Sequence, residues 1–143
     1  MSVKQISVFL ENRPGALLGM TQALAEQGID MRAFSLAETS EFGIARIIVS
    51  DVDKTAAVLR SAGFVHSVTP VIAVAISNTP GGLNRALSVI SGAGVNVEYM
   101  YAFVGGSPES AYMIFRVADN EKAAEALRAA GIRLAEQAEV SNL

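Results

Sequence analysis

The sequence contains no cysteine, and its only histidine is His66. Without cysteine the chain can form neither disulfides nor thiolate metal sites, and it cannot use a cysteine nucleophile. A single histidine also excludes a multi-histidine metal site within one chain. The sequence patterns of phosphate-binding loops, serine hydrolases and zinc proteases are absent as well. We therefore expect a protein with no catalytic residues, no metal site and no cofactor.

Basic residues are in the minority, because 11 Lys and Arg stand against 14 Asp and Glu. This balance offers no excess of cations to neutralise phosphates, so nucleic acid is a poor candidate partner. Long apolar runs are also missing: none approaches the ~20 residues that cross a bilayer, and no secretion signal is recognisable. We expect a cytoplasmic protein that does not associate with membranes.

An internal repeat is the strongest positive feature of the 143 residues. Asn12–Leu17 matches Asn78–Leu83 at an offset of 66 residues, and Gly28–Asp30 matches Gly94–Asn96 at the same offset. Later matches have an offset of 68, and we place the two additional residues near the turn-rich stretch 105–108. The sequence therefore predicts two domains, residues 1–70 and 71–143.

Each copy has the pattern of a β-α-β-β-α-β unit. Period-two alternation predicts first strands at Ile6–Leu10 and Ile72–Ile76, and apolar residues at helical spacing predict a helix after each. Further strands are expected at Asp30–Ala37, Ile44–Ser50, Asn96–Val104, Ala111–Ala118 and Leu134–Val140. This order is typical of α+β, ferredoxin-like folds, in which an antiparallel sheet has its helices on one face.

Turn and cap residues mark the expected helix ends. Proline at the first helical position and glycine after the last are favourable, and they are expected here at Pro14, Pro80, Gly28 and Gly94. Asp53 and Asn120 are expected to be the N-caps of the second helix in each copy. The last strand of the first copy is expected to run almost directly into the first strand of the second.

Three aromatic residues alternate along the strand predicted at Asn96–Val104. Tyr99, Tyr101 and Phe103 share one face, which we assign to the open side of the sheet. The core side is assigned to Met100, Ala102, Phe34 and Leu36. Because exposed aromatic patches mark interfaces, we expect association through this face with the other copy or with a second chain. The alternative is the inverse assignment, with the aromatics in the core.

The loop after the first strand of each copy is the candidate binding site. Backbone N–H groups at a helix start lack partners within the helix and favour an anion such as a carboxylate. Asparagine amides at the loop mouth, and polar residues at the start of the next strand, can contact a carboxylate or an ammonium group. The candidate ligand-binding residues are Asn12, Arg13, Pro14, Gly15, Ala16, Asp30, Asn78, Thr79, Pro80, Gly81, Gly82, Leu83 and Asn96. A purely structural turn is the alternative.

Glu11–Gly15 followed by Gly28–Asp30 resembles an ACT domain, in particular the serine-binding regulatory domain of bacterial phosphoglycerate dehydrogenases. The second copy resembles another ACT domain, so the resemblance covers nearly the whole chain and implies a tandem ACT protein with no enzyme attached. It also implies that an amino acid binds between two ACT domains, with Asn12 paired with Asn96 and Asn78 paired with Asp30.

Two departures from the serine-binding pattern bear on the ligand. Asp30 stands where the family has asparagine, and Leu10 and Ile76 stand where serine-binding domains carry a histidine. The apolar replacements favour a ligand with a larger or more hydrophobic side chain than serine.

The resemblance implies a non-catalytic sensor that binds a free amino acid and regulates amino-acid metabolism allosterically. Such a sensor is expected to form a homodimer or to bind a partner metabolic enzyme. One alternative is a regulatory subunit of a biosynthetic enzyme, similar to the small subunit of acetolactate synthase. Another is a structural association domain without a working pocket. Co-purification with a large catalytic chain favours the regulatory subunit, whereas normal stability without an amino-acid response favours the association domain.

Overall fold

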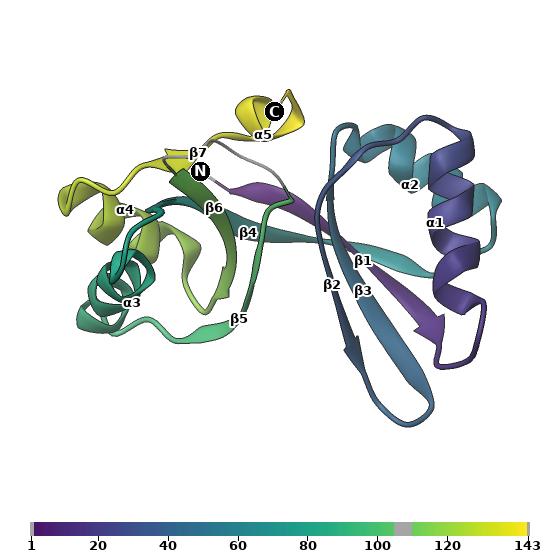
Figure 1. Cartoon of the computed structure of the whole chain (residues 1–143), viewed down its shortest axis with the longest axis horizontal. Coiled ribbons are helices and arrows are strands. Elements are labelled where there is room, and N and C mark those ends of the chain that lie inside the picture. The colour runs from purple at the N-terminus through teal and green to yellow at the C-terminus, as the bar shows by residue number, and fades with distance from the viewer. Residues whose placement is uncertain (1, 105–109, 143) are drawn as a thin grey trace. The chain divides into compact units, whose positions relative to one another are not determined.

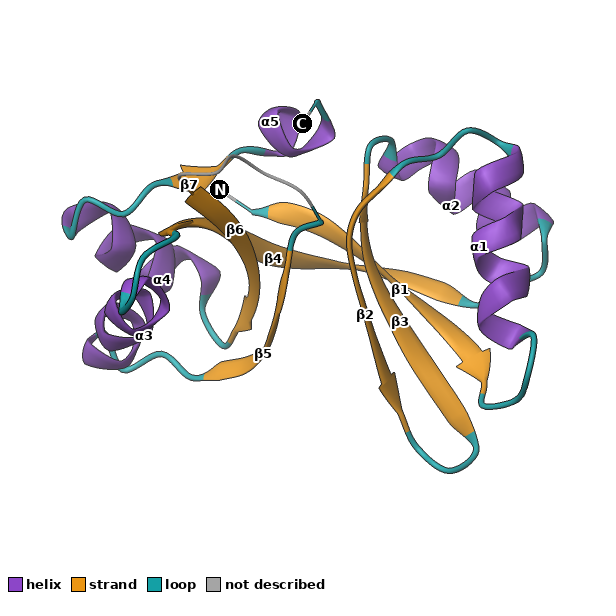
Figure 2. Cartoon of the chain, in the orientation of Figure 1, coloured by secondary structure: helices purple, strands orange, loops and turns teal. Residues whose placement is uncertain are grey.

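The computed structural model describes residues 2–104 and 110–142 of the chain, and its elements are shown in Figures 1 and 2. The chain divides into two compact units, one of Lys4–Thr69 and one of Met1–Val3 with Pro70–Leu143. We call them the N-terminal unit and the C-terminal unit and describe each by itself. The stretch 105–108, where the sequence analysis places the two additional residues, lies outside the described residues.

The N-terminal unit is a β-α-β-β-α-β fold. Its elements are β1 (Val3–Glu11), α1 (Ala16–Glu26), β2 (Met31–Glu38), β3 (Phe42–Val49), α2 (Val52–Ser61) and the first residues of β4 (His66–Ser77). β3 pairs antiparallel with both β1 and β2, and the order across this unit is β2-β3-β1-β4. β2 is therefore an edge strand of the sheet.

The C-terminal unit repeats this order. It contains the rest of β4, then α3 (Gly82–Gly92), β5 (Val97–Ala102), β6 (Ser110–Val117), α4 (Asn120–Ala129), β7 (Leu134–Ala135) and α5 (Gln137–Ser141). Its order across the sheet is β5-β6-β4-β7. The ferredoxin-like α+β prediction is confirmed. As expected, the last strand of the first copy and the first strand of the second form one continuous strand, β4.

Each unit has its own core between one face of its sheet and its two main helices (Figure 2). α1 packs against α2 in the first unit, and α3 packs against α4 in the second. The N-terminal core includes Ile6, Val8, Met20, Leu24, Ile47 and Leu59, and the C-terminal core includes Ile72, Val74, Ile90, Phe115 and Leu127. The apolar residues at helical and period-two spacing are thus the ones that each unit buries.

The helices α1 to α4 end in the same way. After each C-cap residue comes a glycine, and the N–H of the apolar residue that follows donates to a carbonyl five residues earlier, as in Ile29 to Leu24 (3.1 Å) and Phe64 to Leu59 (2.9 Å). This is the Schellman arrangement, which also brings two apolar side chains together. The expected glycine caps at Gly28 and Gly94 are confirmed.

The expected N-caps are wrong by one or two positions. Asp51 and Asp119 cap α2 and α4, and their carboxylates accept hydrogen bonds from the N–H groups of Lys54 (3.0 Å) and Lys122 (3.1 Å). Asp53 and Asn120 lie within the first turn. Aspartate is favourable both at the N-cap and in the first turn of a helix, so the sequence does not distinguish Asp51 from Asp53. The extended backbone of Asp51 is what allows its carboxylate to accept from the first turn.

The expected strand Leu134–Val140 is also wrong beyond Ala135, because α5 follows β7 almost at once. Within α5, Val140 is buried and the Glu139 carboxylate accepts a hydrogen bond from the Tyr112 hydroxyl (2.9 Å). Tyr112 belongs to β6, so the helical turn is held by a residue distant in the sequence.

The prediction that Met100 and Tyr101 lie on opposite faces of β5 is confirmed, whereas Ala102, which the prediction also assigns to the core side, is exposed. Met100 pairs with Phe115 and packs against the C-terminal core, whereas Tyr101 pairs with Ile114 on the opposite face. The rings of Tyr99 and Tyr101 stack with their centroids 6.5 Å apart. Tyr101 is buried, however, so it is not part of an open aromatic surface.

Phe34 and Leu36 lie on the helix side of β2, as predicted, but they are not core residues. They pair with Ile47 and Ala45 of the N-terminal core, yet they are 58% and 51% exposed. β2 is an edge strand of this unit, so its side chains have neighbours on one flank only.

Candidate functional site

The two predicted ligand loops take the same conformation in the two units. α1 and α3 have the N-cap glycines Gly15 and Gly81, whose φ angles are 87° and 86°. This left-handed backbone carries no penalty only in glycine. Pro14 and Pro80 therefore precede the N-cap, and the prediction that they occupy the first helical position is wrong.

The first turns of α1 and α3 differ chemically from those of α2 and α4. A glycine N-cap has no side chain that could accept a hydrogen bond, whereas Asp51 and Asp119 each cap their helix. The first amides of any helix lack partners within the helix. At the two loops no side chain caps the first turn, although the amides of Ala16 and Gly82 donate to the carbonyl oxygens of Arg13 (3.3 Å) and Thr79 (3.1 Å). The positive end of the helix dipole there still favours an anionic group.

Glycine is required at position 82 by the close approach of the preceding strand. A Cβ at this position would lie 2.1 Å from the carbonyl oxygen of Ser77, well inside van der Waals contact. The equivalent residue of the N-terminal unit is Ala16, which is half-buried and carries a Cβ. The start of α3 therefore approaches its preceding strand more closely than α1 permits.

Asn12 fastens its loop to the turn between β2 and β3. Its side-chain nitrogen donates to the carbonyl oxygen of Thr39 (2.8 Å), and its backbone N–H donates to that of Glu41 (3.0 Å). Next to it, the Arg13 guanidinium forms an ion pair with Glu11 (2.5 Å). Both partners of this ion pair are largely exposed.

The second loop is exposed along Asn78, Thr79, Pro80 and Gly81, and Leu83 is 37% exposed. Thr79 occupies the position of Arg13, and its hydroxyl lies 2.8 Å from the hydroxyl of Ser77, which occupies the position of Glu11. The charged pair of the first loop is thus replaced by a neutral pair.

Asp30 and Asn96 lie at the starts of β2 and β5. Both are exposed, and their backbone carbonyls accept equivalent hydrogen bonds from Ser50 and Ala118. The Asp30 carboxylate also forms an ion pair with Arg32 (2.7 Å).

Within one unit, the loop and the start of the second strand lie at opposite ends of the sheet. Glu11 pairs with Phe42 at the beginning of β3, whereas Met31 pairs with Val49 at its end. Seven residues of strand span about 23 Å. The C-terminal unit has the same registers. One bound amino acid therefore cannot contact both Asn12 and Asp30 of the same unit.

A depression of about 330 Å³ adjoins the first loop. The loop residues Arg13, Gly15 and Ala16 form one side of it, and α1 contributes Gly19. The end of β1 and the turn between α2 and β4 complete its wall, with Phe9, Leu10, Glu11, Gly63, Phe64 and Val65. Three of the predicted site residues thus come together with apolar side chains that the prediction did not include.

The sequence model of one family, described as the ACT domain pair, matches residues 1–143. The chain belongs to the ACT domain pair family. The prediction of tandem ACT domains, made from the two Pro-Gly loops and the glycines that follow them, is confirmed.

Solved structures extend this finding. A protein from Bacteroides thetaiotaomicron is 35% identical, with a TM-score of 0.93 over 100% of this chain and 98% of that one. The regulatory subunits of aspartate kinase from Thermus thermophilus and Thermus flavus are 20% and 22% identical, with TM-scores of 0.63 and 0.58. Each comparison covers about nine tenths of both chains, and at this identity it shows a shared fold. The comparison with curated proteins found no match.

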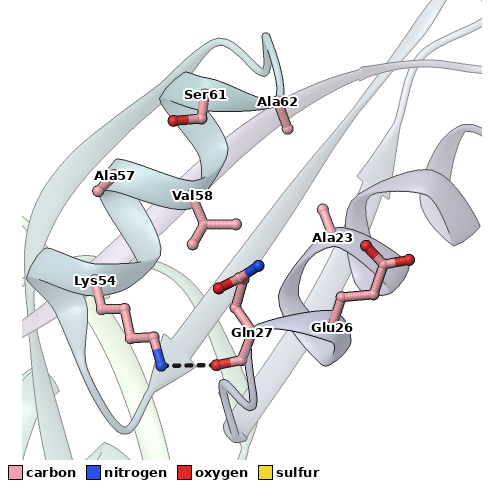
Figure 3. Close-up of a pocket in the computed structure, with 8 residues that line it drawn as sticks. All are labelled: Ala23, Glu26, Gln27, Lys54, Ala57, Val58, Ser61 and Ala62. Carbon is pink, nitrogen blue, oxygen red and sulfur yellow. Dashed lines mark hydrogen bonds between the residues drawn. The ribbon is translucent and has the colours of Figure 1, made fainter.

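The described residues also form hollows that do not include the loops. A groove of about 460 Å³ lies between α1 and α2, where the Lys54 ammonium donates to the Gln27 carbonyl oxygen (2.7 Å; Figure 3). A smaller apolar hollow of about 290 Å³ lies beside β2 and is lined in part by Leu17, Phe34 and Leu36. Neither contains a residue of the predicted site.

The sequence analysis missed a polar cluster in the C-terminal unit. The Arg133 guanidinium donates two hydrogen bonds to the Glu139 carboxylate (2.8 and 2.9 Å) and another to the Tyr112 hydroxyl. The hydrogen bonds from Arg133 lower the pKa of Glu139, and burial, together with the bond to Glu139, raises the pKa of Tyr112. No local signal marks this cluster, because it depends on α5.

The described residues also bear on metal binding and membrane insertion. No group of three or more His, Asp or Glu side chains within residues 2–104 and 110–142 is placed to hold a metal ion. In the same ranges, no helix has both the length and the apolar character needed to span a membrane.

Proposed function

We propose that this protein is a non-catalytic cytoplasmic sensor that binds a free amino acid and regulates amino-acid metabolism allosterically. The proposal rests on the first helix of both ACT domains, which begins at the predicted loop with a glycine as its N-cap residue and with no side-chain cap. An amino-acid carboxylate matches a helix start whose first turn has no capping side chain. The polar residues around the loops offer partners for the ammonium group.

The predicted site comprises the residues 12–16 and 78–83 with Asp30 and Asn96. The opposite-end placement of Asn12 and Asp30 within one unit is compatible with the crossed pairs that the resemblance implies. These pairs, Asn12 with Asn96 and Asn78 with Asp30, stay a prediction.

A second candidate function is that of a regulatory subunit for a biosynthetic enzyme. The Thermus proteins are described as regulatory subunits of aspartate kinase, and they match this chain over nearly their full length. This likeness supports a subunit function for the present chain. In this function the partner is a metabolic kinase or a comparable catalytic chain.

A thermal-shift screen of the purified chain against the twenty amino acids tests the sensor proposal. A ligand at 100 times its Kd stabilises the folded state by ~2.7 kcal/mol, which raises Tm by several degrees. A rise with one amino acid or a related group supports the sensor. No rise with any of them contradicts it, and co-purification with a catalytic chain then favours the subunit function.

A further inference from the structure

The two repeats differ sharply at one position inside their first helix. Gly19 of α1 corresponds to Arg85 of α3 at the repeat offset of 66 residues. Gly19 lines the depression at the first loop. The same place in the C-terminal unit thus carries one of the largest side chains instead of the smallest.

Among the described residues, none makes a contact that requires glycine at this position. A Cβ at Gly19 would meet no atom within 4 Å, and the residue does not have the left-handed backbone that favours glycine. Glycine in a helix interior is nevertheless less favourable than almost any other residue. The N-terminal unit therefore has an unfavourable helix residue at a position that leaves open space beside α1.

Arg85 crosses the equivalent space in the C-terminal unit. Its guanidinium donates a hydrogen bond to the carbonyl oxygen of Ala130, the C-cap residue of α4. The side chain thus runs from α3 to the end of α4. In the N-terminal unit the corresponding gap, between Gly19 and the turn at Gly63 and Phe64, is the depression.

The walls of the depression also differ between the repeats. In the N-terminal unit the lining residues include Glu11 and Arg13, which form an ion pair, and the apolar residues Phe9, Phe64 and Val65. Phe9 and Val65 are 41% and 69% exposed. In the C-terminal unit the equivalent residues are Ser77, Thr79, Ala75, Ile132 and Arg133. Only the residues of the N-terminal unit combine an anion, a cation and apolar neighbours, as an amino acid with an apolar side chain requires.

We propose that the N-terminal unit alone binds the amino acid, in this depression, and that the ligand has an apolar side chain. This inference rests on the proposed function and narrows it to one site per chain. The Arg13 guanidinium takes the ligand carboxylate, and the Glu11 carboxylate takes its ammonium group. The apolar residues Phe64 and Val65 lie beside the ligand side chain and lose exposed apolar area. Arg85 closes the equivalent space in the other repeat.

The test measures binding of isoleucine, phenylalanine, serine and aspartate by titration calorimetry. Wild-type protein is expected to bind one apolar amino acid per chain and to bind serine and aspartate at least roughly tenfold more weakly. Gly19→Arg, which installs the residue of the second repeat, is expected to weaken binding by roughly tenfold or more. Because arginine is a better helix former than glycine, the helix content of the Gly19→Arg variant should not fall.

Gly92→Arg is the matched control. Gly92 also belongs to a helix and also has open space beside it, but it is part of the C-terminal unit and does not line the depression. This variant should keep wild-type affinity and stoichiometry. Wild-type affinity in Gly19→Arg, two ligands per chain, or a preference for serine or aspartate overturns the inference while the sensor function stands. If no amino acid binds the wild-type chain, both the inference and the sensor function are wrong.

Discussion

The side-chain nitrogen of Asn12 donates a hydrogen bond to the carbonyl oxygen of Thr39 at 2.8 Å, which ties the first loop to the turn between β2 and β3. Asn12 therefore has a structural role in the ligand-free protein, besides any role in binding. Its second amide hydrogen and its carbonyl oxygen are further sites for hydrogen bonds. The loop that the sequence predicts to be a binding site is thus held in place by Asn12, one of the candidate ligand-binding residues.

Asn12→Ala is expected to lower the unfolding free energy of the ligand-free protein by about 1 kcal/mol, because one hydrogen bond from the loop is lost. Urea denaturation measures the change. Asn84→Ala, an exposed position within α3, is the control and should not lower stability. Unchanged stability in Asn12→Ala would mean that the contact with Thr39 contributes nothing in solution.

The N-cap of α2 can be tested by two neighbouring aspartates. Asp51→Ala removes the acceptor of the Lys54 N–H bond and should cost about 1 kcal/mol. Asp53→Ala removes only a charge from the first turn and should cost about 0.3–1 kcal/mol at low salt, less when salt is added. Urea denaturation at two salt concentrations distinguishes the two. A larger loss in Asp53→Ala would restore the N-cap that the sequence alone predicts.

Gly82→Ala should destabilise the C-terminal unit, because its Cβ would lie 2.1 Å from the Ser77 carbonyl oxygen. Relieving this overlap requires a backbone shift, for which about 1–3 kcal/mol is typical. The reverse change at the equivalent position, Ala16→Gly, removes no such overlap and should cost at most about 1 kcal/mol. Thermal unfolding followed by circular dichroism measures both, and equal effects would contradict the close approach.

The docking of α5 should depend on pH. Arg133 lowers the pKa of Glu139 below its usual value of 4.5, so the ion pair contributes fully above that value and is lost as the pH falls through the lowered pKa. The pKa of Tyr112 is raised, so the stability from its bond to Glu139 changes in the opposite direction with pH. It is present below the usual tyrosine pKa and is lost as the pH rises through the raised pKa. Because Arg133 is 57% exposed, the contribution should not exceed ~1 kcal/mol.

Tyrosine fluorescence or NMR of α5, followed from pH 7 downward, measures this dependence. Glu139→Gln should remove the acid transition and loosen α5 already at neutral pH. A transition that persists in Glu139→Gln would assign it to another carboxylate.

The sequence predicts those parts of the fold that have local causes. Period-two alternation marks the strands, and the glycines after α1 and α3 mark their ends because the backbone there needs glycine. Other features depend on residues distant in the sequence. α5 forms where Tyr112 holds Glu139, and Phe34 is exposed because β2 lies at an edge.

The candidate site divides in the same way. The two loops are visible in the sequence because proline and glycine have fixed backbone preferences. The apolar wall from Phe64 and Val65 is not, because it comes from the other end of the unit's sequence. The difference between Gly19 and Arg85 is present in the repeat alignment, but it gains a meaning only when the depression is known.

The last prediction concerns which residue receives the ammonium group of the ligand. The sequence analysis assigns this role to Asp30 and Asn96, whereas the depression assigns it to Glu11. Glu11→Gln should weaken amino-acid binding by about 1.5–3 kcal/mol, because a hydrogen bond to a charged group becomes neutral. It should barely change stability, since the ion pair with Arg13 is exposed. Asn96→Ala should leave binding unchanged, because Asn96 does not line the depression. A loss in Asn96→Ala without a loss in Glu11→Gln would favour the crossed pairs instead, since Asn96 would then contact the ligand directly.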